Sequence, residues 1–270
     1  MRAHPYYVNE HYFDNPSRAM YYVLGLSYPK LKPAQENGIT FRCSSKNLVQ
    51  IVEEQLESDH AIMSDPRGKN SHWIEMQSVP YMRNKLDELG FLKHKSKRRV
   101  PKDMPKKYAR PFVRGFVDAK AKVYVIDGER TNVEIHHYNT PLRDIHRLLV
   151  EYAGVKHPTP KGSSVIYNHN DSIRIHNFIY QDWKYTKKHG LYLPSKKKAF
   201  RTNTNYVHPR TLAAQRRMDR AEKMLRHRYR PEIIAVRLGY SSVLSFYTIF
   251  KKVTGKTVNE FRGRKAHWHN

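Results

Sequence analysis

The first two-thirds of the chain alternate between two periods of apolar residues, one typical of helices and one typical of strands. The Glu-Asn-Gly turn at 36–38 lies between two short extended stretches and predicts a hairpin. The whole segment therefore predicts a helix, a hairpin, a helix, a further strand and a helix. The segments in order are residues 15–28, 31–43, 47–56, 72–78 and 79–91.

The same order of periods returns about 90 residues later. An Asp127-Gly128 turn between two β-branched runs is a strong hairpin signal, and Gly115 stands 90 residues after Gly25 in the opening helix. Strand character is expected at 164–170 and 173–175. The other segments are residues 106–118, 122–137, 141–154 and 175–185. The pattern predicts an α+β domain over 1–195 with two repeats, about 10–95 and 105–190, joined by a basic linker at 93–107.

A different pattern follows in the last part of the chain. Residues 211–228 have apolar positions at helical spacing on a basic background. Pro231 suits the first turn of a next helix, Gly239 ends that helix, and Ser241 or Ser242 caps another. A short helix, a turn and a second helix predict a helix-turn-helix, which places one helix in a major groove. We expect an all-α domain over 211–270 behind a basic linker at 196–210.

The charge of the chain points to a polyanionic partner. Its 270 residues include 50 Lys and Arg against 24 Asp and Glu, which gives a formal net charge of +26. Residues 195–270 alone hold 19 basic and four acidic residues. Each cation that neutralises a phosphate releases a condensed counterion, so nucleic acid is the first candidate and an anionic membrane surface the second.

Other features of the composition narrow the classes of function. No apolar run reaches the roughly 18 residues of a membrane span, and residues 1–12 lack the apolar stretch of a signal peptide. We therefore expect a cytoplasmic protein without a membrane partner. Cys43 is the only cysteine and is expected to be a small buried residue. The 16 histidines show no ligand spacing, so neither a metal nor another cofactor is predicted.

Two ten-residue stretches, YYVLGLSYPK at 21–30 and PFVRGFVDAK at 111–120, resemble the signature helices of single-chain LAGLIDADG homing endonucleases. The resemblance implies that the helices cross with Gly25 and Gly115 in contact and that two hairpin sheets form a DNA-binding saddle. In active members each motif ends in an acidic residue that holds a divalent metal ion. Lys30 and Lys120 stand at those positions here, while Asp118 keeps an earlier acidic position and is expected to be structural. The resemblance therefore implies a catalytically degenerate domain that is not an enzyme.

The DNA-facing residues of this domain follow from the same resemblance. Lys30 and Lys120 either clamp a phosphate where the metal ions were or are exposed replacements in a decayed site, and the sequence favours neither. Polar side chains at alternate strand positions would face the major groove. The candidates are Lys32, Arg42, Lys122, Tyr124, Arg130 and His136.

The segment 231–264 resembles the second helix-turn-helix of AraC/XylS transcription regulators. The matches include Ile233, Ala235, LGY at 238–240, FKK at 250–252, TG at 254–255 and FR at 261–262. The resemblance implies a core that includes Ile234, Leu238, Phe246, Ile249 and Phe250. It also implies a recognition helix from Ser242 to Val253.

The recognition helix departs from its family in one respect. Leu244, Tyr247 and Thr248 would face bases, with Ser242, Ser245, Lys251 and Lys252 nearer the DNA backbone. The Arg or Gln that often stands among such positions is absent, so readout would depend on thymine methyl groups and DNA shape. AraC-type regulators usually carry two such motifs, and the sequence shows one.

These observations predict a transcription regulator of a bacterium or its phage that binds one extended, asymmetric site on double-stranded DNA as a monomer. The first alternative is an active LAGLIDADG homing endonuclease with an accessory helix-turn-helix, which the lysines at positions 30 and 120 disfavour. A third interpretation is an RNA-binding, maturase-like protein. A recognition helix that reads a major groove disfavours it, because A-form RNA does not admit such a helix.

Overall fold

The computed structural model describes residues 6–126, 130–200 and 209–263, with the backbone alone for 209–216. The chain divides into two compact units, an N-terminal unit over residues 1–202 and a C-terminal unit over residues 203–270. The N-terminal unit is α+β and the described part of the C-terminal unit is helical. We describe each unit by itself.

The first half of the N-terminal unit begins with helix α1. Ser17, which precedes the helix, caps it by accepting a hydrogen bond from the Met20 amide at 3.0 Å. An antiparallel sheet in the order β1-β2-β4-β3 follows, with α2 and α3 connected to it. The bounds are α1 Arg18–Lys30, β1 Leu31–Pro33, β2 Ile39–Cys43, α2 Lys46–Gln55, β3 Met63–Ser64, β4 His72–Met76 and α3 Pro80–Glu88.

The second half repeats this order of elements. Its antiparallel sheet runs β5-β6-β7, and the predicted Asp127-Gly128 turn between β5 and β6 lies outside the described residues. The bounds are η1 Lys106–Tyr108, α4 Ala109–Lys120, β5 Lys122–Ile126, β6 Arg130–His136, α5 Asn139–Ala153, β7 Ser164–Tyr167, α6 His169–Ile179, α7 Trp183–Lys188 and α8 Pro194–Ala199. Both halves therefore read helix, two strands, helix, further strand and helix, with two further strands (β3 and β4) in the first half and one (β7) in the second.

One predicted strand of the second half is wrong. Residues 173–175 belong to α6, because Asn168 caps this helix through its side chain and Ser172, Ile175 and Ile179 are buried at helical spacing. The short Ile-Arg-Ile alternation at 173–175 fitted either period, and packing of its helical face against the core decided between them.

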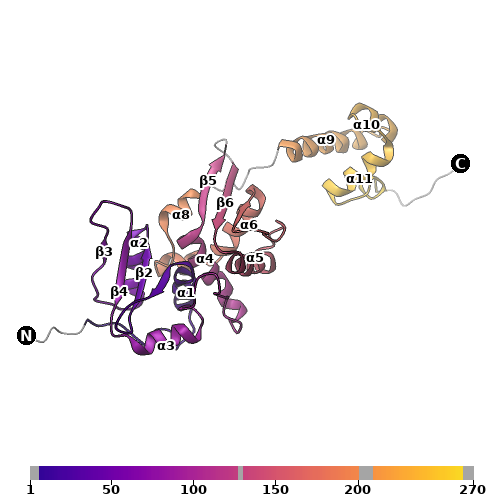
Figure 1. Ribbon diagram of the computed structural model, residues 1–270. Helices are drawn as coiled ribbons and strands as arrows, with labels where there is room; N and C mark the ends of the chain where they lie inside the picture. Colours follow the sequence, from indigo (N-terminus) through magenta and orange to yellow (C-terminus); the bar gives the residue numbers. More distant parts are fainter. Residues whose placement is uncertain (1–5, 127–129, 201–208, 264–270) are drawn as a thin grey trace, which may run out of the picture. The chain divides into compact units, whose positions relative to one another are not determined.

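The two halves meet where α1 packs against α4, and Figure 1 shows these helices between the two sheets. A β-carbon on Gly25 would lie 2.0 Å from the Phe112 carbonyl oxygen, and one on Gly115 would lie 2.1 Å from the Tyr22 carbonyl oxygen. Each glycine therefore lets the backbone of the other helix approach closely, which no residue with a side chain would allow. The contact expected between Gly25 and Gly115 is present.

Residues 93–107, predicted as a linker between the repeats, form hydrogen bonds with the carboxyl end of α1. Arg98 is 2% exposed, and its guanidinium donates to the carbonyl oxygens of Ser27 at 3.3 Å, Tyr28 at 2.5 Å and Leu31 at 2.7 Å. The Ser27 and Tyr28 carbonyls belong to the last turn of α1, where carbonyl groups lack backbone donors within the helix, and Leu31 is the residue that ends the helix. Its neighbour Arg99 pairs with Asp144 of α5 at 2.7 Å. Part of residues 93–107 is thus an element of the core and not a loose connection.

The C-terminal unit consists of four described helices around a small core. Met218, Ala221 and Leu225 form the buried face of α9, and Ile234, Phe246 and Phe250 pack on it from α10 and α11. The bounds are α9 Pro209–Arg226, α10 Pro231–Arg237, α11 Val243–Thr254 and α12 Val258–Phe261. The predicted core positions Leu238 and Ile249 are partly buried against this cluster.

The predicted linker at 196–210 lies between these units. Its residues 196–199 belong to α8, because Leu193 and Phe200 are buried on either side of them. Residues 201–208 lie outside the described part of the chain.

Candidate nucleic-acid interface

The amino end of α11 is fixed by a reciprocal pair of hydrogen bonds. The Ser242 hydroxyl accepts from the Ser245 amide at 3.0 Å, and the Ser245 hydroxyl accepts from the Ser242 amide at 3.2 Å. Gly255 ends the helix with φ at 75°, which glycine adopts without strain. The helix therefore has the extent predicted for the recognition helix, with Ser242 as its cap. Because the Ser242 and Ser245 hydroxyls already form these hydrogen bonds, they have fewer free hydrogen-bonding positions for contact with DNA.

The outer face of α11 presents the predicted base-reading side chains. Leu244, Tyr247, Thr248 and Lys251 have the spacing of one helical face, and Phe246 and Phe250 point into the core. Leu244 is 73% exposed, an unusual position for a large apolar side chain. We call these four residues the outer face of α11.

The chemistry available on this face is mostly apolar. The Thr248 hydroxyl donates to the Leu244 carbonyl oxygen at 3.0 Å, which leaves that hydroxyl only as an acceptor and leaves its methyl group free for apolar contact. Tyr247 is half-buried beside Phe246, while Lys251 and Lys252 are exposed. A hollow of about 270 Å³ adjoins the face and is lined in addition by Thr257, Val258 and Asn259. Sequence reasoning did not assign Thr257, which caps α12, or Val258 and Asn259 of α12 to this face, because their place beside α11 depends on the turn after Gly255.

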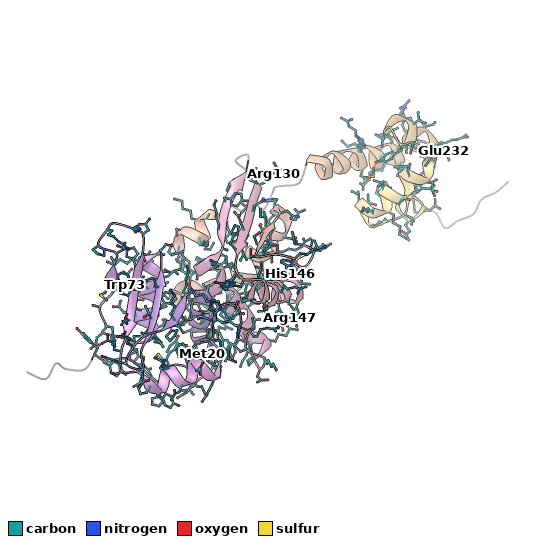
Figure 2. All side chains as sticks on the ribbon, viewed as in Figure 1. Met20, Trp73, Arg130, His146, Arg147 and Glu232 are labelled. Carbon is teal, nitrogen blue, oxygen red and sulfur yellow. The ribbon has the colours of Figure 1, made fainter. Side chains whose placement is uncertain are left out.

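In the sheet of the first half, the predicted residues Lys32 and Arg42 lie on the side away from the core. Ile39, Phe41 and Cys43 of β2 are buried, so the alternating Thr40 and Arg42 face outward. The Arg42 guanidinium lies 4.1 Å from the ring centroid of Trp73, its partner across β4. Figure 2 labels Trp73 on this sheet. Sequence reasoning did not single out Trp73, whose ring contacts the arginine side chain.

The sheet of the second half carries the other four predicted residues. Lys122 and Tyr124 lie on β5, and Arg130 and His136 occupy β6 positions that alternate with the buried Thr131, Val133 and Ile135. They lie opposite Glu134, Asn132, Ile126 and Ser164 respectively. His136 contacts Glu134 at 2.6 Å, so an acidic side chain shares this face. Arg130, labelled in Figure 2, begins β6 at the hairpin end of the sheet.

A group of lysines surrounds the carboxyl ends of α1 and α4. Lys30 and Lys120 end these helices, Lys95 lies in the segment between the repeats, and Lys196 of α8 donates a hydrogen bond to the Ala121 carbonyl oxygen. We call these four residues the lysine centre. Lys30 is partly buried and Lys120 is exposed. Sequence reasoning found the first pair from the motif and missed Lys95 and Lys196, which tertiary packing brings to the same place.

The charges of this centre act on one another. Burial and then the charges of Arg98, Lys32, Lys30 and Lys120 lower the pKa of Lys95 to about 8. Burial and then Lys120, Lys95, Arg98 and Lys30 lower the pKa of the buried His137 to about 4. Such shifts arise where like charges are close and partly desolvated. The centre is therefore a concentration of positive charge that an anion would stabilise.

Asp118, near the carboxyl end of α4, has a structural role in the fold. Asp118 is buried and accepts hydrogen bonds from the Tyr22 hydroxyl at 2.8 Å and the Leu193 amide at 3.0 Å. Burial raises its pKa to about 7. Within the part of the chain that the structure describes, no group of three or more His, Cys, Asp or Glu side chains is arranged to hold a metal ion. No helix of the same part is long and apolar enough to cross a membrane.

Comparison with known proteins bears on the C-terminal unit. Residues 195–264 match the family model of a helix-turn-helix domain. This match supports the AraC-type helix-turn-helix predicted there. No curated protein matches the chain. The fold and the outer face of α11 thus define a helix-turn-helix DNA-binding domain, of a kind found in transcription regulators.

Proposed function

We propose that this protein is a sequence-specific regulator of transcription that binds double-stranded DNA through both units and does not cleave it. The observation that carries the proposal is the outer face of α11, where Leu244 stands exposed between a capped amino end and a basic carboxyl end. A helix built in this way on a helix-turn-helix enters the major groove and reads base edges. Leu244 and the Thr248 methyl group suit thymine methyl groups.

The N-terminal unit is proposed to be a degenerate LAGLIDADG-type domain. Two observations support this assignment. The order of helices and strands is repeated, and α1 and α4 cross closely at Gly25 and Gly115. In such a domain the outer faces of the two sheets form the saddle that follows the major groove. These faces hold Lys32 and Arg42 on one sheet and Lys122 and Arg130 on the other. Two halves already supply two half-site readers, so we propose a monomer on one asymmetric site.

The lysine centre supports the proposal that the N-terminal unit binds DNA without cleaving it. Phosphodiester cleavage by metal ions needs converging oxygen ligands, and ammonium groups at Lys30 and Lys120 repel a divalent cation. A phosphate placed between them relieves the repulsion among the four lysines. We therefore assign the centre as a clamp for the DNA backbone, which strengthens binding to every sequence alike.

The test begins with selection of duplexes from a random pool by the full chain, followed by titration of a selected duplex and a scrambled duplex of the same length. Leu244→Ala is expected to cost about 1–3 kcal/mol on the selected duplex and little on the scrambled one. Val236→Ala on α10, which removes a side chain that is 78% exposed, is the matched control and leaves both affinities unchanged. Equal losses on both duplexes for Leu244→Ala would contradict base reading by α11.

Strand integrity and RNA competition complete the test. With Mg²⁺ present, we expect the selected duplex to be shifted and intact, whereas cut strands would establish the endonuclease instead. Structured RNA is expected to compete less well than the selected duplex, because the deep, narrow major groove of A-form RNA excludes a recognition helix. Stronger competition by RNA would overturn the assignment of DNA as the ligand.

A further inference from the structure

A pocket of about 580 Å³ in the C-terminal unit is walled by four arginines. Arg226 ends α9, Arg228 and Arg230 lie in the turn before α10, and Arg262 follows α12. The apolar part of the pocket is formed by Leu225 and Phe261. No acidic side chain lines it, and none of the ion pairs in the described part of the chain involves these arginines. We call it the arginine pocket.

Two of the four guanidinium groups are held in place by the fold. Arg262 donates a hydrogen bond to the Tyr229 carbonyl oxygen, and the Arg226 guanidinium lies 5.7 Å from the ring centroid of Phe261. Arg228 adopts a φ of 62°, a left-handed conformation that turns the chain directly after α9. The pocket is thus built by the turn and by contacts between α9 and α12. It is more than a chance meeting of mobile side chains on a solvated surface.

The arginine pocket is connected to the outer face of α11 through α12. Phe261 of α12 lines the pocket, and Val258 and Asn259 of the same helix line the hollow beside Tyr247 and Lys251. Burial and the charge of Glu232 raise the pKa of Tyr247, and the charge of Arg262 opposes that rise. The base-reading face therefore has a cationic pocket beside it, where the edge of a DNA groove would bring the phosphate backbone.

From this arrangement we propose that the arginine pocket binds phosphodiester groups of the DNA backbone at the edge of the groove that α11 enters. The inference rests on the proposed function and adds an anchor to it. Guanidinium groups match phosphate oxygens in paired hydrogen bonds, and several of them around one open pocket suit an extended anion. The anchor contributes equally to all sequences and fixes the position of α11 over the bases.

The experiment uses the full chain with Arg228→Asn and Arg230→Gln combined. Asn is chosen at 228 because it tolerates the left-handed conformation. On both the selected and the scrambled duplex, affinity is expected to fall about tenfold or more, and the slope of log K against log salt to fall by about two. The matched control is Arg220→Gln with Lys223→Gln, which removes the same charge from exposed positions of α9 outside the pocket. We expect it to change the slope by less than half as much.

A scan with single methylphosphonates locates the contact. Neutralising particular phosphates is expected to weaken binding of the unaltered protein. The variant with Arg228→Asn and Arg230→Gln, called the pocket variant, should bind with the same affinity whether or not those phosphates are neutralised. Equal slope changes in the control variant, or equal sensitivity of both proteins to the methylphosphonates, would overturn the inference. It would equally fail if the pocket variant kept its DNA affinity but lost binding to pyrophosphate or to a polyglutamate peptide, because the pocket would then serve a small anion or an acidic protein.

The two proposals fail differently. If the unaltered protein binds neither duplex, the proposed function is wrong. If it binds selectively and the pocket variant binds like it, only the arginine pocket is wrong. Matched circular dichroism and melting temperatures of the two double variants verify that each is folded, and Arg228→Lys with Arg230→Lys should retain most of the salt slope because it keeps the charge.

Discussion

Gly25 and Gly115 are the residues on which the centre of the N-terminal unit depends. Each faces a carbonyl oxygen of the other helix at a distance that a β-carbon cannot occupy. Because both contacts are with backbone, no side-chain rotation relieves them.

The first prediction concerns these glycines. Gly25→Ala is expected to destabilise the N-terminal unit by about 3 kcal/mol, since the helices must separate along much of their contact. Gly162→Ala is the control, because a β-carbon there meets nothing within 4 Å, and it should change stability by less than about 0.5 kcal/mol. Urea unfolding followed by circular dichroism measures both. A neutral Gly25→Ala would mean that the two helices do not pack in this way.

Lys95 supplies the second prediction, at the same scale. Its pKa of about 8 is lowered by burial and by neighbouring cations, so a bound phosphate raises it toward the ordinary value. Binding then takes up a proton near pH 8 to 9, and affinity for a scrambled duplex falls as pH rises through this range, by up to about tenfold.

The control for that titration is Lys95→Arg, which keeps its charge throughout the range. It should bind at pH 7 like the unaltered protein and lose less affinity at pH 9. Dissociation constants at fixed salt, together with binding heats in two buffers of different ionisation enthalpy, report the proton uptake. Identical pH profiles for the two proteins would remove Lys95 from the DNA contact.

Single residues also show where reading of the sequence failed. Arg98 stands in a run of basic residues that has the composition of a linker, yet it is buried against the end of α1. Lys95 and Lys196 are 101 residues apart and act on the same centre through Lys30. Charge runs usually indicate solvated surface, and only the fold shows which members are enclosed.

At the scale of elements, α11 is the helix whose limits were best predicted. Its cap residue, its closing glycine and its apolar spacing are all local signals, and the structure places the helix at Val243–Thr254. The strand predicted at 173–175 was wrong because its signal was a single alternation, Ile-Arg-Ile, which is too short to distinguish a strand from a helix.

The third prediction tests the cap of α11. Ser242→Ala removes the acceptor of the Ser245 amide and is expected to destabilise the C-terminal unit by about 1 kcal/mol, while Ser242→Asp should be nearly neutral because aspartate caps as well. Thermal unfolding of the full chain, with probes in the C-terminal unit, gives the difference. If the alanine variant unfolds at the same temperature as the unaltered protein, the reciprocal capping pair does not stabilise the helix in solution.

At the scale of the whole molecule, the question is whether both units contact one duplex. The N-terminal unit offers two outward sheet faces and the lysine centre, and the C-terminal unit offers the outer face of α11 and the arginine pocket. Backbone contacts set affinity and base contacts set specificity, so the parts of a joint reader have separable effects.

The fourth prediction follows from that separation. Lys30→Ala with Lys120→Ala should weaken binding to selected and scrambled duplexes alike and reduce the salt slope by about two, whereas Leu244→Ala should affect the selected duplex alone. The combined variant should lose the sum of the two free energies within about 0.5 kcal/mol, because the sites are independent. Fluorescence anisotropy at several salt concentrations measures all three. A lysine variant with unchanged affinity for both duplexes would show that the N-terminal unit does not take part.

The sequence by itself determined what depends on local signals and on totals. These are the basic charge, the repeated order of helices and strands, and the helix-turn-helix. Periodicity, caps and turns act over a few residues, so they can be read along the chain.

The tertiary structure alone decided what depends on residues that meet from distant segments. It enclosed Arg98, brought Lys95 and Lys196 to the ends of α1 and α4, and brought Trp73 to Arg42. It also brought Arg262, which follows α12, to Arg226, Arg228 and Arg230 at the end of α9 and in the turn after it. Long-range neighbours are set by how helices and sheets pack, and the packing depends on the shapes of whole faces, which no short stretch of sequence contains.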